Sequence, residues 1–348
     1  PRVTNDRTRH TSFECHLWPD RIFGTGPGYS GQLFMILPAL EDLAVGVLYP
    51  GEMGSAVGQL LCAEGCDVVT TLDGRSRRTE QLCGQTSLHV LSSFEDVLDV
   101  ADVIISLVNP NAAVEVARRF VHTAAGMKNP PRLYIDANST SPASARQIHR
   151  LIDARGTSFC DMTICGTSGQ LDTHSIAYLS GDGAAATAQL FESALHVRNL
   201  GDVVGDASAM KALVSGLTVG VGSLFFEFAL LAERMELTDE FLADVQGVHP
   251  GVFELLERTL MTYPQYSARH ATEMAELSTT FRSLGLVPRT ARSAQHTLRQ
   301  VSSSSLGQRW RQVDSARKNV RTLITLLRQE FPFASDDDTG TAAGIAPL

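Results

Sequence analysis

The stretch Val-Gly-Val-Leu-Tyr-Pro-Gly-Glu-Met-Gly, residues 45–54, decides the fold. Its short apolar run ends in glycines and leads directly into residues 55–64, whose composition is typical of a helix. Such a strand, turn and helix can bind a pyrophosphate. Gly51 lets the backbone come close to the anion, Gly54 lets the helix pack on its strand, and the helix N-terminus offers free N–H groups. The stretch therefore predicts a dinucleotide site.

The glycine motif is incomplete, because Tyr49 replaces the first glycine of the G-x-G-x-x-G pattern and Pro50 follows it. The order of the segments downstream strengthens the prediction. Runs typical of strands, each followed by a helical pattern, occur at residues 66–72, 103–108 and 133–137. This alternation predicts an α/β fold with a doubly wound parallel sheet of the Rossmann type. An ordinary tight turn in another α/β fold is the structural alternative for Gly51 and Gly54.

The pattern changes from α/β to all-α near residue 206. One long apolar helix is predicted over residues 206–233, and further helical segments follow at 239–262, 267–284, 288–301 and 307–330. The predicted organisation is an N-terminal extension of 1–44, a Rossmann domain of 45–205, an all-α domain of 206–332 joined by the long helix, and a disordered tail of 333–348.

Composition and charge narrow the class of protein. The net charge of −9 argues against a nucleic-acid partner, and the locally basic segment 299–328 is interpreted as the solvated face of a terminal helix. The longest uncharged run, residues 212–226, is too short to span a bilayer. The six cysteines show no metal-pair spacing and no disulfide framework. We therefore predict a cytoplasmic protein without a metal site or a membrane partner.

The long helix carries large apolar side chains among its glycines. Leu224, Phe225, Phe228 and Leu231 would lie in water if the helix were exposed. We therefore expect these residues to be buried in a core or against a second subunit, and the latter arrangement predicts a homodimer.

Several short motifs follow the glycine turn in order: Asp136-x-x-Ser139-Thr140-x-Pro142, Phe159-x-Asp161, and Lys211 on a helix. In this order they resemble the β-hydroxyacid dehydrogenases, the superfamily that includes the 3-hydroxyisobutyrate and 6-phosphogluconate dehydrogenases. The spelling of the turn, Asp-Gly-Arg-Ser at 73–76 and the segment 269–276 are similar to a 6-phosphogluconate dehydrogenase-like branch with its own C-terminal domain. The resemblance implies a Rossmann domain, a helical domain that often dimerises through its long helix, and hydride exchange with a nicotinamide cofactor between them.

Lys211 is one of three lysines in the chain, and it lies on an otherwise apolar helix. A partly desolvated lysine can exchange a proton near neutral pH, whereas an arginine cannot. Interconversion of an alcohol and a carbonyl needs such a group, because a proton moves at oxygen while a hydride moves at carbon. The resemblance implies that Lys211 is this acid/base. A lysine that merely reaches solvent is the structural alternative.

Ser139 and Thr140 follow a predicted strand, at the edge where a doubly wound sheet presents residues to ligands. Their hydroxyls could bind a substrate carboxylate. They could also cap the helix that begins near Pro142, for which Ser141 is another candidate. The two roles are not exclusive.

Three further positions are predicted to contact the substrate. Ser215 lies one turn after Lys211, where the family usually has an asparagine, and a hydroxyl there offers fewer hydrogen bonds. Gly166 belongs to a segment in which Cys165 replaces the serine of the family's Ser-Gly-Gly motif. His270, with Glu273, is expected to line the helical side of the cleft or to form local ion pairs rather than to bind a metal.

The predicted cofactor site combines the glycine turn with the ends of the next two strands, at Tyr49, Pro50, Gly51, Glu52, Met53, Gly54, Gly74, Arg75, Ser76, Val108 and Asn109. Arg75 follows the second strand, where the adenosine ribose is expected. An arginine there accommodates the 2′-phosphate of NADP, whereas NAD enzymes place an acidic residue there. Asp73 is close by, but the basic neighbours of Arg75 favour NADP over NAD.

These observations predict an NADP(H)-dependent oxidoreductase that interconverts a small hydroxy acid and its carbonyl counterpart, with Lys211 as acid/base. One alternative is imine reduction, which needs a strong lysine acid less. Another is a dinucleotide-binding protein without catalysis, because Tyr49, Cys165 and Ser215 depart from the family pattern. The presence of Lys211 favours the first hypothesis.

Overall fold

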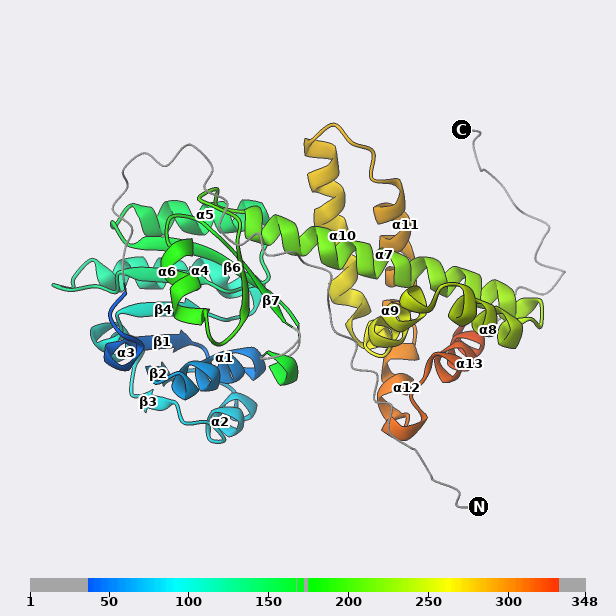
Figure 1. Ribbon diagram of the computed structural model, residues 1–348, viewed down its shortest axis with the longest axis horizontal. Coiled ribbons are helices and arrows are strands. Elements are labelled where there is room, and N and C mark those ends of the chain that lie inside the picture. Colours follow the sequence, from blue (N-terminus) through cyan, green and yellow to red (C-terminus); the bar gives the residue numbers. More distant parts are fainter. Residues whose placement is uncertain (1–36, 167, 172–174, 332–348) are drawn as a thin grey trace, which may run out of the picture. The chain divides into compact units, whose positions relative to one another are not determined.

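The computed structural model describes residues 37–166, 168–171 and 175–331, and contains an eight-stranded sheet with the order β3-β2-β1-β4-β5-β6-β7-β8 (Figure 1). The strands are β1 Ala44–Leu48, β2 Asp67–Thr71, β3 His89–Leu91, β4 Val103–Ser106, β5 Leu133–Asp136, β6 Ser158–Cys165, β7 Ile176–Ser180 and β8 His196–Asn199. The predicted tail and residues 1–36 of the predicted extension lie outside the described residues.

Neighbouring strands are parallel throughout the sheet except β6 and β7, which pair antiparallel. The central strands β1, β4 and β5 consist almost entirely of buried residues, as expected for parallel strands covered on both faces. The chain order reverses between β1 and β4, which are hydrogen-bonded neighbours. The predicted Rossmann fold is therefore confirmed, and the crevice beyond the ends of β1 and β4 is the expected ligand position.

Helices connect the strands of the sheet: α1 Glu52–Ala63, α2 Arg77–Cys83, α3 Phe94–Val100, α4 Pro110–Ala124, α5 Pro142–Asp153 and α6 Ala184–Phe191. Aromatic packing fixes α4 and β6 to β5. The ring of Tyr134 lies 4.9 Å from that of Phe120 and 6.3 Å from that of Phe159. All three side chains are fully buried, so this part of the sheet is a rigid base for the strand ends.

The helix α7 Asp206–Arg234 runs without interruption for 29 residues, close to the predicted 206–233. It contacts β6 and β7 at its start and the C-terminal helices along the rest of its length. The C-terminal helices are α8 Thr238–Val248, α9 Pro250–Leu260, α10 Tyr263–Ser283, α11 Arg289–Ser303, α12 Leu306–Gln312 and α13 Val320–Glu330. The side chains of α7 thus pack against both the sheet and the C-terminal helices.

Two of the predicted helical segments are each divided into two helices. Segment 239–262 breaks at His249, because the proline that follows disfavours helical backbone there and begins α9 instead. Segment 307–330 breaks between α12 and α13, where Asn319 accepts a hydrogen bond from the backbone N–H of Thr322 and caps the new helix. These breaks let the helices fold back on a common core that contains the fully buried Trp310.

The expected burial of the apolar residues of α7 is only partly observed. Phe225 is buried, but Leu224, Phe228 and Leu231 are each more than half exposed. Together with Leu213 and Leu217 they form an exposed stripe at helical spacing along α7, which we call the α7 stripe. The prediction that these side chains are buried in the core of one chain is therefore wrong. Burial against a second subunit stays a prediction.

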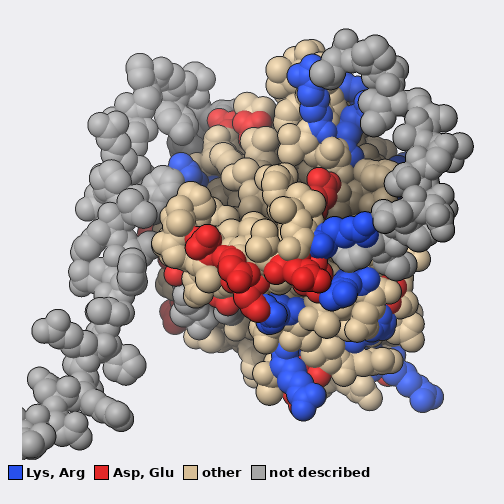
Figure 2. Space-filling view, turned by 90° about the vertical axis from the view of Figure 1, so that its right-hand side faces the viewer, with Lys and Arg blue, Asp and Glu red and all other residues tan. Residues whose placement is uncertain are grey.

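The end of the helical part faces the viewer in Figure 2, where acidic side chains form a band across the surface and basic side chains lie beside it. Ion pairs hold α13 in place here, with Arg328 lying 2.9 Å from Glu233 and Arg321 pairing with Asp239. Among the described residues, α7 is by length and composition the one helix that could cross a membrane. Core helices of soluble proteins pass the same test, so the absence of a membrane partner stays a prediction.

Candidate active site

The turn between β1 and α1 leaves an open helix N-terminus. Gly51 is the N-cap of α1, and no side chain caps the first turn of this helix. A Cβ atom on Gly51 would meet no atom within 4 Å, so the space in front of the turn is free. A Cβ atom on Gly54 would overlap the carbonyl oxygen of Tyr49, so only glycine allows the helix to start so close to the strand. The turn therefore fits the pyrophosphate of a dinucleotide.

The residues after β2 lie beside this turn. Gly74 has a φ of +68°, a conformation that favours glycine, and it reverses the chain toward Arg75. The guanidinium of Arg75 lies 4.0 Å from the centre of the Tyr49 ring, and its Nε donates a 3.2 Å hydrogen bond to the backbone oxygen of Asp73. Ser76 caps α2, accepting a hydrogen bond from the N–H of Thr79. The strand end thus holds a cation at the edge of the glycine turn.

Glu52 and Met53 complete the first turn of α1. The carboxylate of Glu52 forms an ion pair with the guanidinium of Arg78 on α2, which balances its negative charge. Pro50 precedes the N-cap, and its backbone oxygen accepts a 2.9 Å hydrogen bond from the hydroxyl of Ser55. These contacts fix the shape of the turn within the protein itself.

The ends of β4 and β5 are joined by one side chain. Asn138, which is buried, donates hydrogen bonds to Asp136 and, at 3.1 Å, to Ser106, and its Oδ1 accepts a 2.6 Å hydrogen bond from the N–H of Val108. Asn109 caps α4 by accepting a hydrogen bond from the N–H of Asn111. These hydrogen bonds fix the backbone position of Val108 and Asn109, two of the predicted cofactor residues, at the end of β4.

The carboxyl group of Asp136 is fully buried at the end of β5. Its Oδ2 atom and the buried Oγ1 of Thr140 have no partner of full hydrogen-bond geometry within the described part of the chain, but the Thr140 hydroxyl is close enough to the carboxyl group to lower its pKa. Burial raises the pKa of Asp136 from 3.8 to about 7, against the hydrogen bond from Asn138, which lowers it. A proton can therefore reside on this carboxyl group near neutral pH.

A cavity lies between the segment 139–142, α7 and α10. Ser139, Thr140, Lys211 and Ser215, all predicted as site residues, line it together with Glu273. Capping of α5 falls to Ser141, whose Oγ accepts a 3.2 Å hydrogen bond from the N–H of Ser144. Ser139 and Thr140 are therefore not needed as caps and face the cavity.

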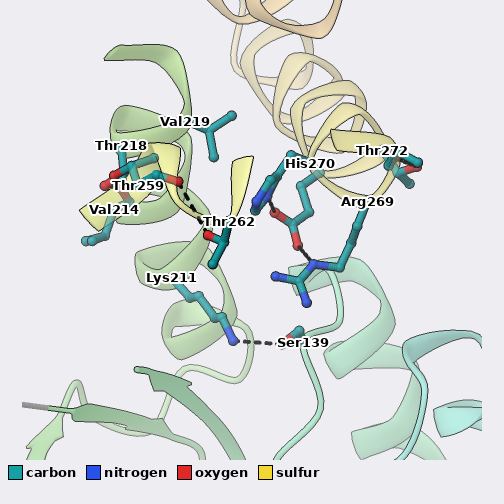
Figure 3. A network of polar contacts seen from close by, with 12 residues as sticks. Ser139, Lys211, Val214, Thr218, Val219, Thr259, Thr262, Arg269, His270 and Thr272 are labelled. Atoms are coloured by element: carbon teal, nitrogen blue, oxygen red, sulfur yellow. Dashed lines mark hydrogen bonds and ion pairs between the residues drawn. The ribbon is translucent and has the colours of Figure 1, made fainter. Parts of the chain in front are cut away.

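Lys211 extends from α7 toward Ser139, and its Nζ lies 2.7 Å from the Oγ of that serine (Figure 3). Burial lowers the pKa of Lys211, while Cys165 and Glu273 raise it and Arg269 lowers it further. The lysine is thus not a surface group reaching into bulk water. Its charge depends on these surroundings.

On the opposite wall, α10 presents a small ionic cluster. Glu273 accepts a 3.0 Å hydrogen bond from His270 and pairs with Arg269 at 3.2 Å, and both basic side chains are seen beside Lys211 in Figure 3. Burial raises the pKa of Glu273, but His270 and Arg269 outweigh this effect, so its pKa lies below the ordinary value. Glu273 is therefore ionised and faces the lysine.

Two predicted substrate residues do not line the cavity. His270 holds Glu273 instead, as the alternative of local ion pairs proposed. Gly166 lies at the end of β6, where a Cβ atom would overlap the side chain of Ser175, so close packing explains this glycine. The thiol of the preceding Cys165 is near enough to Lys211 to affect its pKa, which the sequence did not indicate.

Sequence reasoning also missed the function of Asp161. This buried carboxylate on β6 accepts hydrogen bonds from the N–H groups of Gly205 and Ser208 and from the hydroxyls of Ser180 and Ser208. These donors surround the start of α7. Asp161 therefore anchors the start of α7, the helix that carries Lys211, to the sheet. Its only signal in the sequence was its place in a family motif.

Comparison with known families agrees with this geometry. Residues 44–198 match the NAD binding domain of 6-phosphogluconate dehydrogenase. This part of the chain is an NAD-binding domain of that family. Residues 232–301, which follow the NAD-binding domain, match a domain family of unknown function, DUF1932. The resemblance inferred from the motifs, including the separate C-terminal branch, is confirmed.

Individual relatives extend this result beyond the NAD-binding domain. An uncharacterized 28.5 kDa protein of Methanothermus fervidus is 25% identical over 71% of this chain and 94% of its own length. Glyoxylate/succinic semialdehyde reductase 2 of Arabidopsis thaliana is 26% identical over 59% of this chain and 58% of its own length.

Solved structures share the fold. A conserved protein of unknown function, described as similar to 3-hydroxyacid dehydrogenases, superposes with a TM-score of 0.61 at 27% identity, over 75% of this chain and 97% of its own. The 3-hydroxyisobutyrate dehydrogenase of Mycobacterium tuberculosis superposes with a TM-score of 0.62 at 18% identity, over 82% of this chain and 99% of its own. The NAD-binding domain and the helices that follow it thus form the fold of 3-hydroxyacid dehydrogenases.

Proposed function

We propose that this protein is an NADP(H)-dependent oxidoreductase that interconverts a small hydroxy acid and its carbonyl counterpart. The observation that carries the proposal is Lys211, whose Nζ lies 2.7 Å from Ser139 inside a cavity beside the ends of the sheet. The cavity combines a proton carrier with hydroxyl groups, and the glycine turn of the same sheet fits a dinucleotide.

Lys211 moves the proton of the reaction. In the oxidation, its neutral amine takes the proton from the substrate hydroxyl, and in the reduction its ammonium returns a proton to the carbonyl oxygen. A bound nicotinamide accepts or supplies the hydride at the substrate carbon. Burial lowers the pKa of Lys211, so its ammonium releases a proton more readily than that of a solvated lysine.

Hydroxyl groups orient the acid end of the substrate. Ser139, Thr140 and Ser215 line the cavity, and the hydroxyl of Ser139 lies 2.7 Å from the Nζ of Lys211. A substrate carboxylate in the cavity would accept hydrogen bonds from these hydroxyl groups.

Arg75 supports NADP over NAD. Its guanidinium lies at the end of β2 beside the glycine turn, and its Nε donates to a backbone oxygen, which leaves the other guanidinium donors for a 2′-phosphate. An Arg75→Ala variant should lose at least tenfold in NADPH affinity and less than threefold in NADH affinity. Fluorescence titration measures both, and equal losses would contradict the preference.

The named relative supports the substrate class. The Arabidopsis protein is called a reductase of glyoxylate and succinic semialdehyde, which are small acids with a carbonyl group. Purified protein should therefore oxidise NADPH with one or more short oxo acids, measured at 340 nm. A Lys211→Met variant should lose at least 10²-fold in kcat, whereas the same change at the exposed Lys128 should have less than a twofold effect. No turnover and no NADPH binding by wild type would remove the proposal.

A further inference from the structure

Tyr49 occupies a position at which the dinucleotide motif ordinarily has glycine, where that glycine serves the tight turn after the strand. The backbone makes this turn without it. The N–H of Gly51 donates a 2.9 Å hydrogen bond to the carbonyl oxygen of Tyr49, whose own N–H donates at 3.4 Å to the carbonyl oxygen of Leu107. The side chain of Tyr49 therefore has to be explained by contacts of its own.

The ring of Tyr49 belongs to the core of the sheet. Tyr49 is only 6% exposed, and it packs in the hydrophobic cluster that contains Leu48, Val69 and Phe94. Side chains in such a core are closely packed and keep one orientation. The ring thus presents a fixed aromatic face at the edge of the glycine turn.

The guanidinium of Arg75 covers this face. Its central carbon lies 4.0 Å from the centre of the Tyr49 ring, a distance typical of a cation–π contact. Arg75 is exposed whereas Tyr49 is buried, so the ring lies on the protein side of the guanidinium and supports it from below. The opposite face of the guanidinium is turned toward solvent.

Hydrogen bonds fix one edge and the backbone of the same residue. The Nε of Arg75 donates to the carbonyl oxygen of Asp73, and the backbone N–H of Arg75 donates a 2.9 Å hydrogen bond to the carbonyl oxygen of Leu72. The N–H of Asp73 in turn donates to the Oγ1 of Thr71 at 3.3 Å. Within the described part of the chain, the two Nη groups of Arg75 form no hydrogen bond or ion pair. The open edge of the guanidinium therefore carries donors from which a phosphate can accept.

Arg78, three residues later, differs from Arg75 in this respect. Its guanidinium pairs with the carboxylate of Glu52, so its charge is already balanced. Arg75 is paired with no carboxylate of the described residues, and it remains available to an anion. An arginine side chain has several rotatable bonds, so holding it in one orientation before a ligand binds lowers the entropic cost of binding.

We propose that Tyr49 is a positioning residue for the 2′-phosphate of NADP(H), whose ring holds the guanidinium of Arg75 with its Nη groups free for the phosphate. This inference rests on the proposed function, and it extends the cofactor preference from Arg75 alone to the Tyr49–Arg75 pair. With glycine at position 49, as in the ordinary motif, the guanidinium would lose this support and adopt many orientations.

NADP⁺ and NAD⁺ test this inference, because they differ only in the 2′-phosphate. Their binding to the full chain is measured by calorimetry without substrate, so the result does not depend on turnover. Wild type should bind NADP⁺ about tenfold more tightly than NAD⁺. A variant that merely distorts the glycine turn weakens the binding of both dinucleotides and leaves their affinity ratio unchanged, whereas a variant that releases Arg75 lowers the ratio.

Tyr49→Phe and Tyr49→Met separate the aromatic face from the space that the side chain fills. Phenylalanine should keep the ratio within about twofold of wild type, whereas methionine, which packs well in cores but has no aromatic face, should lower it about fivefold. In an Arg75→Ala background, Tyr49→Met should not lower the ratio further, because both changes remove one contact. Tyr266→Met, the same change at another ring beneath an arginine, should leave the ratio as in wild type.

Wild type provides a second measurement that needs no change at Tyr49. The ring current of Tyr49 should shift the proton signal of the Arg75 Nε–H upfield of that of a solvated arginine in a nuclear magnetic resonance spectrum. The signal is identified by its absence in Arg75→Lys, and it should stay upfield when NADP⁺ is bound. A signal that moves to the solvated position on binding would show that the guanidinium leaves the ring, and it would overturn the inference.

The outcomes separate the inference from the proposed function. An affinity ratio that depends on the aromatic face at position 49 supports the inference even if no oxo acid is reduced, in which case the proposed function fails. A ratio that falls in Arg75→Ala but not in Tyr49→Met supports the cofactor preference and overturns the inference. Wild type that binds both dinucleotides equally also overturns the inference, while turnover of an oxo acid with NADH would still support an oxidoreductase. Wild type that binds neither dinucleotide overturns both.

Discussion

The Oδ1 of Asp161 accepts a 2.8 Å hydrogen bond from the Oγ of Ser208, a residue three positions before Lys211 on the same helix. The backbone N–H of Ser208 and that of Gly205 donate to the other oxygen of the carboxylate. The position of the lysine is therefore set by a buried charge on the sheet. The accuracy of the site depends on a residue that does not line it.

Asp161→Asn should weaken both the fold and the site. The amide keeps one acceptor but brings two donors against the N–H and O–H groups around the start of α7, so at least one buried pair is lost. We expect the free energy of unfolding to fall by about 2–4 kcal/mol, measured by urea denaturation. The same substitution at the exposed Asp153 should cost less than about 0.5 kcal/mol. An equal loss of stability at the two positions would contradict the role of Asp161 as the anchor of α7.

Gly51→Ala and Gly54→Ala should have opposite effects. At Gly51 the new methyl group meets no protein atom and φ is −69°, so stability should be unchanged while dinucleotide affinity falls at least tenfold. At Gly54 the methyl group would overlap the oxygen of Tyr49, so stability should fall by about 1–3 kcal/mol. Thermal unfolding and NADPH titration distinguish the two. Normal NADPH binding by the Gly51→Ala variant would argue against a cofactor at this turn.

The pH dependence of the reaction should report the lowered pKa of Lys211. Reduction needs the ammonium form, so its kcat/KM should fall as pH rises through this pKa, whereas oxidation needs the amine and should become faster. Glu273→Gln removes a charge that raises the pKa, and it should move both transitions to lower pH. Parallel pH profiles of kcat/KM in the two directions provide the measurement. Unshifted transitions in the Gln variant would show that another group titrates.

Asp136 should make the fold less stable as pH rises. Folding raises its pKa from 3.8 to about 7, so between these values the folded protein retains a proton that the unfolded chain has lost. The free energy of unfolding therefore decreases from pH 4 to pH 7, by about 4 kcal/mol from this group alone. Asp136→Asn should lack this contribution. Urea denaturation of both proteins at pH 4.5 and 8 measures this contribution. The same change in the free energy of unfolding between these pH values in wild type and Asp136→Asn would refute it.

The α7 stripe leads us to propose a homodimer. Leu224, Phe228 and Leu231 are more than half exposed in the single chain, and a second copy could cover them. Wild type should sediment as a dimer at micromolar concentration, and Leu224→Glu with Phe228→Glu should give monomers. Val100→Glu, a charge placed on an exposed apolar residue of α3, should remain dimeric. A monomeric wild type would contradict the proposal.

Local signals made the sheet predictable. The glycine turn, the apolar strands and the long helix each depend on neighbours in the sequence, so residues 45–54 and the helix starting at 206 could be placed without coordinates. The break at Pro250 also has a local signal, because the residue before a proline disfavours the helical conformation. The prediction of one continuous segment followed the apolar pattern, which continues across this proline.

The site was predictable only in part. Ser139, Thr140 and Lys211 lie in recognisable motifs and meet in the cavity. The role of Asp161 depends on donors 19–47 residues away, and sequence spacing cannot show that they converge. Likewise, the sequence does not show which face of α10 is turned inward, so it left open whether Glu273 lines the cavity or only forms local ion pairs.

The side chain of Asn138 has a consequence for motion. Since it bonds the end of β4 to the segment that follows β5, these two strand ends cannot shift independently. A displacement of the turn after β4 would therefore be transmitted to Ser139, which follows Asn138 in the chain and lines the cavity.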